Sequence, residues 1–244
     1  MADIPEYVVE RLRRDPPAGA CIVPNSTPVL AFGNPTMARI ATLGINPSRL
    51  EFLDNDGHEF DAPAHRLESL TSLARTSLAD APIEVLRTVV DGCNGYFGRN
   101  PYRRWFDQLD LILKACEASY YDGSACHLDL VQWTTDPTWS NLSDSIRSML
   151  MRPDARFLLR QLDNEDIRVL LLNGRTVLRE FTTASGIDLV EQSQKVMGRT
   201  RMFTGRGPHG MRIVGWSTNL QSSFGVSNEH RSRIAQSVAT LVQI

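Results

Sequence analysis

Four short apolar runs in this chain are each followed by polar side chains that suit a flat, hydrogen-bonding ligand. Asn46-Pro47-Ser48 follows the first run, Gln132-Trp133 stands at the end of the second, Asn173 is the last residue of the third, and Ser217–Gln221 follows the fourth. Amides and hydroxyls bond the edge of a planar ring, and indoles cover its face. Brought together, these four ends would form a pocket for a ligand such as a nucleobase.

The elements that position these residues are predicted from the pattern of apolar residues. The apolar runs are short and rich in Leu or β-branched residues, as strands buried on both faces are. They span residues 39–44, 127–132, 169–173 and 212–216. Helices are predicted over residues 3–14, 65–79, 82–91, 102–116, 142–150, 155–163, 174–183 and 227–242. The alternation predicts an α/β fold, a three-layer α/β/α sandwich on a central four-stranded, mainly parallel sheet. Ligands of such sheets bind beyond the carboxyl ends of the strands.

Residues 187–211 break this alternation and are polar and rich in glycine, which predicts a hairpin or a long loop. From residue 192 to residue 228 the chain has five basic residues and no acidic one. A basic segment of this kind is expected to contact phosphate groups. A solvated basic loop is the alternative.

Composition indicates a globular protein with one domain over residues 1–244, in which residues 1–36 form an N-terminal helix and a surface segment. The chain has 244 residues, 42% of them hydrophobic, and a formal net charge of −2. No apolar run reaches the roughly 20 residues that span a bilayer, so no membrane partner is expected. The four cysteines include no CxxC pair, which favours reduced thiols in the cytoplasm and no metal site. We expect a monomer.

The stretch Gly44-Ile45-Asn46-Pro47-Ser48 resembles the first motif of the uracil-DNA glycosylase superfamily, in its mismatch-specific uracil/thymine branch. In that superfamily a strand of an α/β/α sandwich ends in Gly, a variable residue, Asp or Asn, and Pro. The resemblance implies that Asn46 positions the water that attacks the sugar carbon. It also implies that no metal or organic cofactor is needed, because the close cysteine pair of the iron–sulfur branches is missing.

The segment Trp216–Gly225 is similar in layout to the second motif of the superfamily, whose leucine enters the DNA minor groove. Leu220 would be that wedge. Some branches carry a His here that stabilises the uracil anion, whereas this chain has Trp216 or Ser217. Residues 96–106 resemble the segment that supplies an aromatic ring to stack on the flipped base, which points to Tyr96 or Phe97.

The resemblance and the strand ends together define the expected site. The residues expected to bind the base are Gly44, Ile45, Pro47, Ser48, Tyr96, Phe97, Gln132, Trp133, Asn173, Trp216, Ser217 and Asn219. Those expected to contact DNA are Arg199, Arg201, Arg206, Leu220, Gln221 and Ser222.

Alternatives remain for the residue that acts on water. An amide is no general base, but its carbonyl can orient water for a cation-like transition state. Asp54 or Asp56 would be the base instead, and Asp129 and Asp136 also lie close to strand ends. Structural roles are open too: Asn46-Pro47 as a strand-ending turn, Asn173 as a helix cap, and Trp133 as a core residue.

The expected function is excision of uracil, or of another damaged, mismatched or modified base, from DNA. Hypermodified cytosine in phage DNA is one such target and would imply a role in antiphage defence. A catalytically inactive nucleic-acid-binding module of the same fold is a second hypothesis. A hydrolase of free nucleosides or nucleotides is a third, and it would make no use of Leu220 or of the basic segment.

Overall fold

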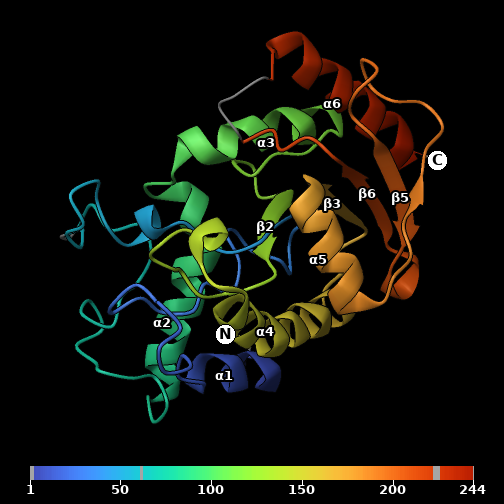
Figure 1. The fold of residues 1–244 in the computed structure, drawn as a ribbon. Coiled ribbons are helices and arrows are strands. Elements are labelled where there is room, and N and C mark those ends of the chain that lie inside the picture. The colour runs from blue at the N-terminus through green and yellow to red at the C-terminus, as the bar shows by residue number, and fades with distance from the viewer. Residues whose placement is uncertain (1–2, 61–62, 222–225, 244) are drawn as a thin grey trace. The chain divides into compact units, whose positions relative to one another are not determined.

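The computed structural model describes residues 3–60, 63–221 and 226–243 (Figure 1). The chain divides into two compact units and enters each of them more than once. The first unit comprises residues 1–32, 45–101 and 129–160, and the second comprises residues 33–44, 102–128 and 161–244. The expectation of one domain over residues 1–244 stays a prediction.

The sheet belongs to the second unit, apart from Asp129 at the end of β2. Within the described residues it has six strands, in the order β2-β1-β3-β6-β5-β4. The strands are β1 Ile40–Gly44, β2 Ala125–Asp129, β3 Val169–Asn173, β4 Val190–Glu191, β5 Met202–Arg206 and β6 Arg212–Trp216. β3 is parallel to β1 and to β6, whereas β5 is antiparallel to β6 and β4 is antiparallel to β5.

The predicted α/β class is confirmed, but the sheet is six-stranded and mixed rather than four-stranded. The added strands come from residues 187–211, where β4 and β5 form an antiparallel arm on the edge of β6. Val190 and Glu191 of β4 are both exposed, so this arm lacks the apolar run that marks a buried strand. The second predicted strand is also displaced, since β2 ends at Asp129 and Gln132 lies beyond it.

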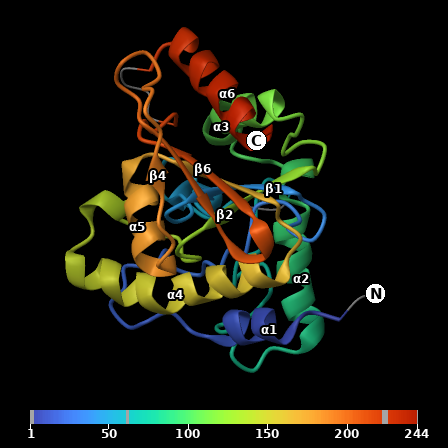
Figure 2. The same ribbon diagram turned by 90° about the vertical axis from the view of Figure 1, so that its right-hand side faces the viewer.

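Helices cover both faces of the sheet within the second unit (Figures 1 and 2). They are α3 Arg103–Ala115, α5 Arg175–Ser185 and α6 Asn228–Gln243. On one face, Phe106 of α3 meets the His127 ring of β2 edge to face, and Arg212 of β6 donates to the Val242 carbonyl of α6. On the other face, a Cβ added at Gly215 would meet Leu178 of α5. Neighbouring residues of a strand point to opposite faces, so β6 contacts both layers.

The first unit consists of helices and long connecting segments. Its α-helices are α1 Glu6–Arg13, α2 Ile83–Asn94 and α4 Asp144–Asn164, with residues 161–164 of α4 in the second unit. Short 3₁₀ helices are η1 Arg49–Glu51, η2 Tyr96–Gly98 and η3 Trp139–Asn141, while η4 Pro208–Gly210 lies in the second unit. No helix within the described residues is long and apolar enough to cross a bilayer.

The helix predicted over residues 65–79 is wrong, because this segment forms successive turns. Ser69 and Ser72 each accept a hydrogen bond from the other's backbone N–H, at 3.1 and 3.0 Å. Ala74 has a positive φ of 51°. Serine side chains that bond nearby backbone compete with helix formation, and the apolar spacing alone did not reveal this competition.

A buried ionic network joins α1 to α4 in the first unit. Arg11 Nη2 lies 3.3 Å from Asp154 Oδ2, and both side chains are 1% exposed. Arg14 also donates to Asp154. Asp154 Oδ2 accepts the backbone N–H of Gln132 at 3.0 Å, and Gln132 Oε1 accepts from Arg11 Nε at 3.1 Å. Charges of both signs are thus paired inside this unit, as burial requires.

Candidate functional site

The amide of Asn46 is held by its nitrogen end in the first unit. Asn46 Nδ2 donates to the carbonyl oxygens of Trp133, at 3.2 Å, and Pro47, at 3.3 Å, and lies 3.1 Å from Thr135 Oγ1. Carbonyl oxygens only accept, so the NH₂ group must face them and Oδ1 must face the other way. No donor among the described residues bonds Oδ1, and the residue is half-buried. Asn46 therefore presents one fixed acceptor.

The residues on either side of Asn46 shape the chain around it. Gly44 ends β1, and the Ile45 carbonyl accepts from the Val131 backbone N–H at 2.8 Å. Pro47 is buried, and Ser48 Oγ accepts from the Leu50 N–H at 3.2 Å, which caps η1. The Ser48 hydroxyl thus has a local structural role. Contact of these residues with a base stays a prediction.

Asp54 and Asp56, the alternative bases, form a turn. Asp54 Oδ1 accepts the backbone N–H groups of His58 and Asp56, both at 2.9 Å. The hydrogen bond from His58 is the main reason that the pKa of Asp54 is lowered. A lower pKa makes a weaker base. The geometry therefore favours a turn-forming role for Asp54 over activation of water.

Tyr96 and Phe97 lie in the core of the first unit rather than on a surface. Tyr96 is 0% exposed and packs edge to face on Phe32 and Phe97, with ring centroids 4.7 and 5.1 Å apart. Its hydroxyl donates to Glu51 Oε2 at 2.6 Å. Both rings are thus packed within the core, and stacking of either on a base stays a prediction.

Glu51 is a perturbed group that the sequence analysis missed. It is 1% exposed, and burial raises its pKa to about 7, while the Tyr96 hydroxyl opposes the shift. Carboxyls with such shifts are often functional, although buried structural groups show them too. The sequence does offer one sign of it, because Glu51 is a charged residue between the apolar residues Leu50 and Phe52, five residues after Asn46.

Gln132 and Trp133 differ in how far their polar atoms are occupied. Gln132 accepts from Arg11 through Oε1 and donates to the Asp129 carbonyl through Nε2 at 2.8 Å, so its amide is spent on the buried network. Trp133 is 3% exposed, and its Nε1 has no partner among the described residues. The Arg11 guanidinium lies 4.8 Å from the Trp133 ring centroid, and Trp133 lines a cavity of about 180 Å³. Both ends of the Gln132 amide therefore have a partner within the protein, whereas the Trp133 Nε1 donor has none among the described residues.

Asn173 braces the loop that follows β6 in the second unit. Its Oδ1 accepts from Trp216 Nε1 at 2.9 Å and from the Leu220 N–H at 3.0 Å. Its Nδ2 donates to Asn219 Oδ1 and Gln221 Oε1, both at 3.0 Å. All polar atoms of the amide are occupied. Asn173 does not cap α5, which has no side-chain cap. Contact of Asn173 with a base stays a prediction.

The loop after β6 is folded back onto the second unit. Trp216 and Leu220 are both 0% exposed. Gln221 Nε2 donates to the Trp105 carbonyl at 3.3 Å, and Ser217 Oγ accepts from the Arg201 N–H at 2.9 Å. A wedge has to leave the protein surface to enter DNA, whereas Leu220 is buried here, and its role as a wedge stays a prediction. Ser222, also expected to contact DNA, lies outside the described residues.

The three arginines expected to contact DNA are exposed but do not form one patch. Arg199 and Arg201 lie where the hairpin arm meets Ser217, beyond the carboxyl end of β6. Arg206 pairs with Arg212 at the amino end of β6. Strands rise about 3.3 Å per residue, so Arg206 is separated from Arg201 by the length of β5. Arg199 and Arg201 thus share one edge that Arg206 does not, and phosphate contact by any of the three stays a prediction.

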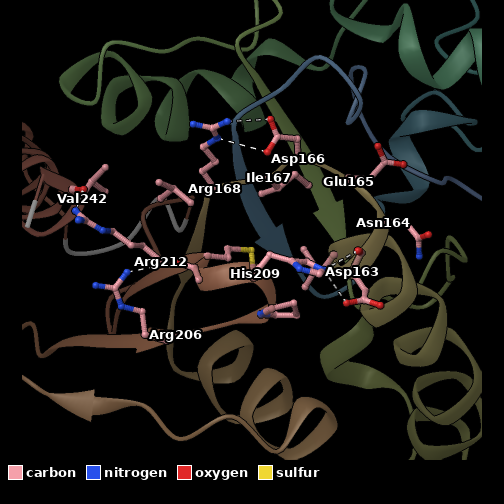
Figure 3. A pocket seen from close by; sticks show the side chains of 15 residues that line it. Asp163, Asn164, Glu165, Asp166, Ile167, Arg168, Arg206, His209, Arg212 and Val242 are labelled. Atoms are coloured by element: carbon pink, nitrogen blue, oxygen red, sulfur yellow. Dashed lines mark hydrogen bonds and ion pairs between the residues drawn. The ribbon is translucent and has the colours of Figure 1, made fainter.

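A cavity of about 740 Å³ lies at the amino ends of β3 and β6, the edge opposite to the predicted strand ends (Figure 3). Arg168 pairs with Asp166 in its lining at 3.3 Å, and His209 Nε2 lies 3.1 Å from Asp163 Oδ1. Arg206 donates to the Gly210 carbonyl. Arg212 likewise donates to a backbone carbonyl, that of Val242, so both of these arginines bond carbonyl oxygens rather than carboxylates.

Among the described residues, no three His, Cys, Asp or Glu side chains are grouped so that they could hold a metal ion. The four cysteines are free thiols. No protein-family model matches the chain, and no curated protein matches it either.

Proposed function

We propose that this chain is a monofunctional DNA N-glycosylase of the uracil-DNA glycosylase superfamily. The strands β2-β1-β3-β6 would be the four-stranded sheet of that superfamily, to which β4 and β5 are added. The observation that carries the proposal is the fixed amide of Asn46, whose Oδ1 is left as an acceptor at the end of the first motif.

The chemistry requires a positioned water more than a strong base. As the N-glycosidic bond breaks, the sugar gains positive charge and the base leaves with the bonding electron pair. Asn46 Oδ1 accepts a hydrogen bond from the water molecule. This bond orients the water so that a lone pair of its oxygen points at the sugar carbon. The water oxygen bonds to that carbon, and its proton passes to solvent. Positioning of this kind supplies much of a rate enhancement when the geometry is fixed in advance.

The target is uracil or another damaged, mismatched or modified base, and the protein acts on DNA as a cytoplasmic monomer without metal or organic cofactor. Hypermodified cytosine of phage DNA is included, which would make the protein a defence factor. The loop of Trp216 lacks the His of some branches, so we expect a pocket that differs from that of the uracil enzymes.

A second candidate function is hydrolysis of free nucleosides or nucleotides by the same chemistry. The burial of Leu220 favours it, because a substrate outside a duplex needs no wedge. The separation of Arg206 from Arg199 and Arg201 also favours this second candidate, because the three arginines do not form one patch for a DNA backbone.

One substrate panel separates these functions. The protein is incubated with free nucleosides and with single strands and duplexes that carry uracil, mismatched thymine or modified cytosine. Alkaline cleavage then reveals abasic sites, and chromatography reveals the freed base. We expect release from DNA. Release from nucleosides alone would favour the second candidate, and release from no substrate together with DNA binding would leave only a binding module.

A further inference from the structure

The cavity of about 740 Å³ at the amino ends of β3 and β6 belongs entirely to the second unit (Figure 3). Its lining comes from the end of α4, the segment that leads into β3, the hairpin turn between β5 and β6, and Val242 of α6. Ligand pockets commonly have volumes of about 300–1,000 Å³, so this one has room for a small organic molecule. The proposed function uses the other edge of the sheet and leaves this cavity unassigned.

Two arginines of the lining stand opposite one another. Arg206 ends β5, Arg212 begins β6, and the two are direct partners in the antiparallel pairing. Opposite residues of such a pair point to the same face of the sheet, with Cβ atoms about 5 Å apart. Figure 3 shows both side chains on the same side of the cavity. Like charges placed this way destabilise a sheet, and an anion between them would remove the repulsion.

Neither of these arginines has a carboxylate partner among the described residues. Arg206 Nη1 donates to the Gly210 carbonyl at 3.3 Å, and Arg212 Nη1 donates to the Val242 carbonyl. A guanidinium has five N–H donors in a planar fork, so one such bond leaves the other donors for a ligand. Two positive charges therefore lack a direct negative partner in this part of the structure.

The cavity also has acidic residues in its lining, and they limit the kind of anion that it can take. Arg168 Nη2 lies 3.3 Å from Asp166 Oδ2, and His209 Nε2 lies 3.1 Å from Asp163 Oδ1. Glu165 is the third carboxylate of the lining. These three carboxylates would repel the successive phosphates of a polymer, whereas a single anionic group can lie beside the two opposed arginines.

The hairpin turn between β5 and β6 is held in one conformation. The Gly207 N–H donates to the Met211 carbonyl at 2.8 Å, and the Met211 N–H donates to the Pro208 carbonyl at 2.9 Å. His209 has a φ of +51°, which a non-glycine residue adopts at an energetic cost and which is concentrated at functional loops. Its Nε2–H donates to the Asp163 carbonyl at 3.1 Å and so ties the turn to the end of α4. Donors fixed in this way lose little conformational freedom on binding.

We infer that this cavity binds the phosphate group of a small organic molecule, and that Arg206 and Arg212 hold that group. A phosphate monoester carries a charge of about −1.5 to −2 at neutral pH, which matches two guanidinium groups, whereas a carboxylate brings one charge. The guanidinium fork also fits a pair of phosphate oxygens. The inference goes beyond the proposed function and does not depend on it, because the two sites lie at opposite edges of the sheet.

The experiment measures the affinity of the full chain for glycerol phosphate and for inorganic phosphate, by calorimetry at neutral pH and constant ionic strength. We expect both to bind the wild type. Arg206→Gln should lower each affinity by about tenfold or more, the size of one charge-assisted hydrogen bond. Arg212→Gln should have an effect of the same size. Arg179→Gln, at an exposed position of α5 where the arginine pairs with Glu180, should leave both affinities unchanged.

Thermal unfolding provides a second readout, because the repulsion between the two arginines acts only while the cavity is empty. Without phosphate, Arg206→Gln should unfold at the wild-type temperature or above it. With glycerol phosphate, the wild type should gain more stability than Arg206→Gln, since a ligand that binds the folded state stabilises it. If neither arginine variant folds, backbone NMR of the wild type replaces them, and the amide signals of Gly207 and Gly210 should shift on addition of glycerol phosphate.

Three results would overturn the inference. The first is that neither phosphate compound binds the wild type. The second is that Arg206→Gln binds glycerol phosphate as tightly as the wild type, or that the NMR shifts lie only outside the cavity. A short DNA duplex distinguishes a small ligand from a nucleic-acid backbone, and we expect Arg206→Gln to bind it like the wild type. The third result is the reverse: a loss of affinity for the duplex with none for glycerol phosphate.

Discussion

Asn46 differs from the other amides of the predicted site because only one end of it is occupied. Gln132 and Asn173 use both ends of their amides in bonds within the protein. A side chain whose polar atoms are all satisfied has nothing left for a ligand unless a bond breaks. Asn46 keeps one atom for a partner, and this is why the proposed function rests on it.

Glu51 provides a prediction at the same scale. Its pKa is raised from 4.5 in the unfolded chain to about 7 in the fold. The protonated form is therefore favoured by folding, and its contribution is complete below the unfolded pKa and lost as pH rises through about 7. A shift of this size corresponds to about 3 kcal/mol of unfolding free energy. Urea unfolding at about pH 4 and about pH 8 measures it.

Glu51→Gln tests that assignment, because glutamine stays neutral and still offers an oxygen to Tyr96. Between about pH 4 and about pH 8, the free energy of unfolding of the variant should fall by about 3 kcal/mol less than that of the wild type. Glu84→Gln, at an exposed position of α2, should behave like the wild type. Equal pH dependence of the wild type and Glu51→Gln would show that Glu51 is not the group that titrates.

The sequence predicted residues that a local motif defines and missed those that depend on tertiary partners. Asn46 is recognisable because Gly44 and Pro47 flank it. The burial of Leu220 follows from a fold-back onto Asn173, which lies 47 residues earlier. The His230 contact with Thr200 likewise spans 30 residues. No pattern within one segment carries such information.

At the scale of elements, the buried pair of Arg11 and Asp154 connects α1 with α4. Asp154→Asn would leave the Arg11 guanidinium buried without its countercharge. Removing one partner of a buried pair typically costs about 3–5 kcal/mol, and we expect a loss of that size in chemical denaturation. Asp144→Asn in the same helix removes an exposed pair with Arg147 and should cost less than about 1 kcal/mol. Similar losses in both variants would contradict the importance of the buried pair.

Helices and strands with strong periodicity were predicted well. β3 and β6 have the predicted bounds, and α3, α5 and α6 begin and end within two residues of theirs. The two helices predicted over 142–150 and 155–163 are one helix that continues through Pro153. Proline removes a hydrogen bond but does not always end a helix when packing holds both sides.

At the scale of the whole molecule, charge is the property that bears on DNA. The net charge of −2 requires any contact with DNA to be local. Arg199 and Arg201 lie on the edge of the second unit that also holds Ser217, and Arg206 lies at the opposite edge. The expected contact surface is therefore one edge of the sheet rather than the entire basic segment.

Charge reversal tests this surface. Arg199→Glu with Arg201→Glu should weaken DNA binding and lower the slope of log affinity against log salt, by about one for each phosphate that the protein no longer neutralises. Binding is the readout, because Arg199 also bonds His230 within the protein. Arg206→Glu adds the same kind of charge at the far edge and should change the slope little. If all variants have the same salt slope as the wild type, Arg199 and Arg201 do not contact phosphates and are only solvated surface residues.

The measurement that tests the central claim most directly is single-turnover release of base by the wild type and by Asn46→Ala, on the best substrate of the panel. We expect release by the wild type and a loss of about 10²-fold or more in Asn46→Ala, with equal DNA affinity. Asn141→Ala, an exposed amide of the first unit, should match the wild type. Release by Asn46→Ala at the wild-type rate, or no release by the wild type from any substrate, would contradict the account.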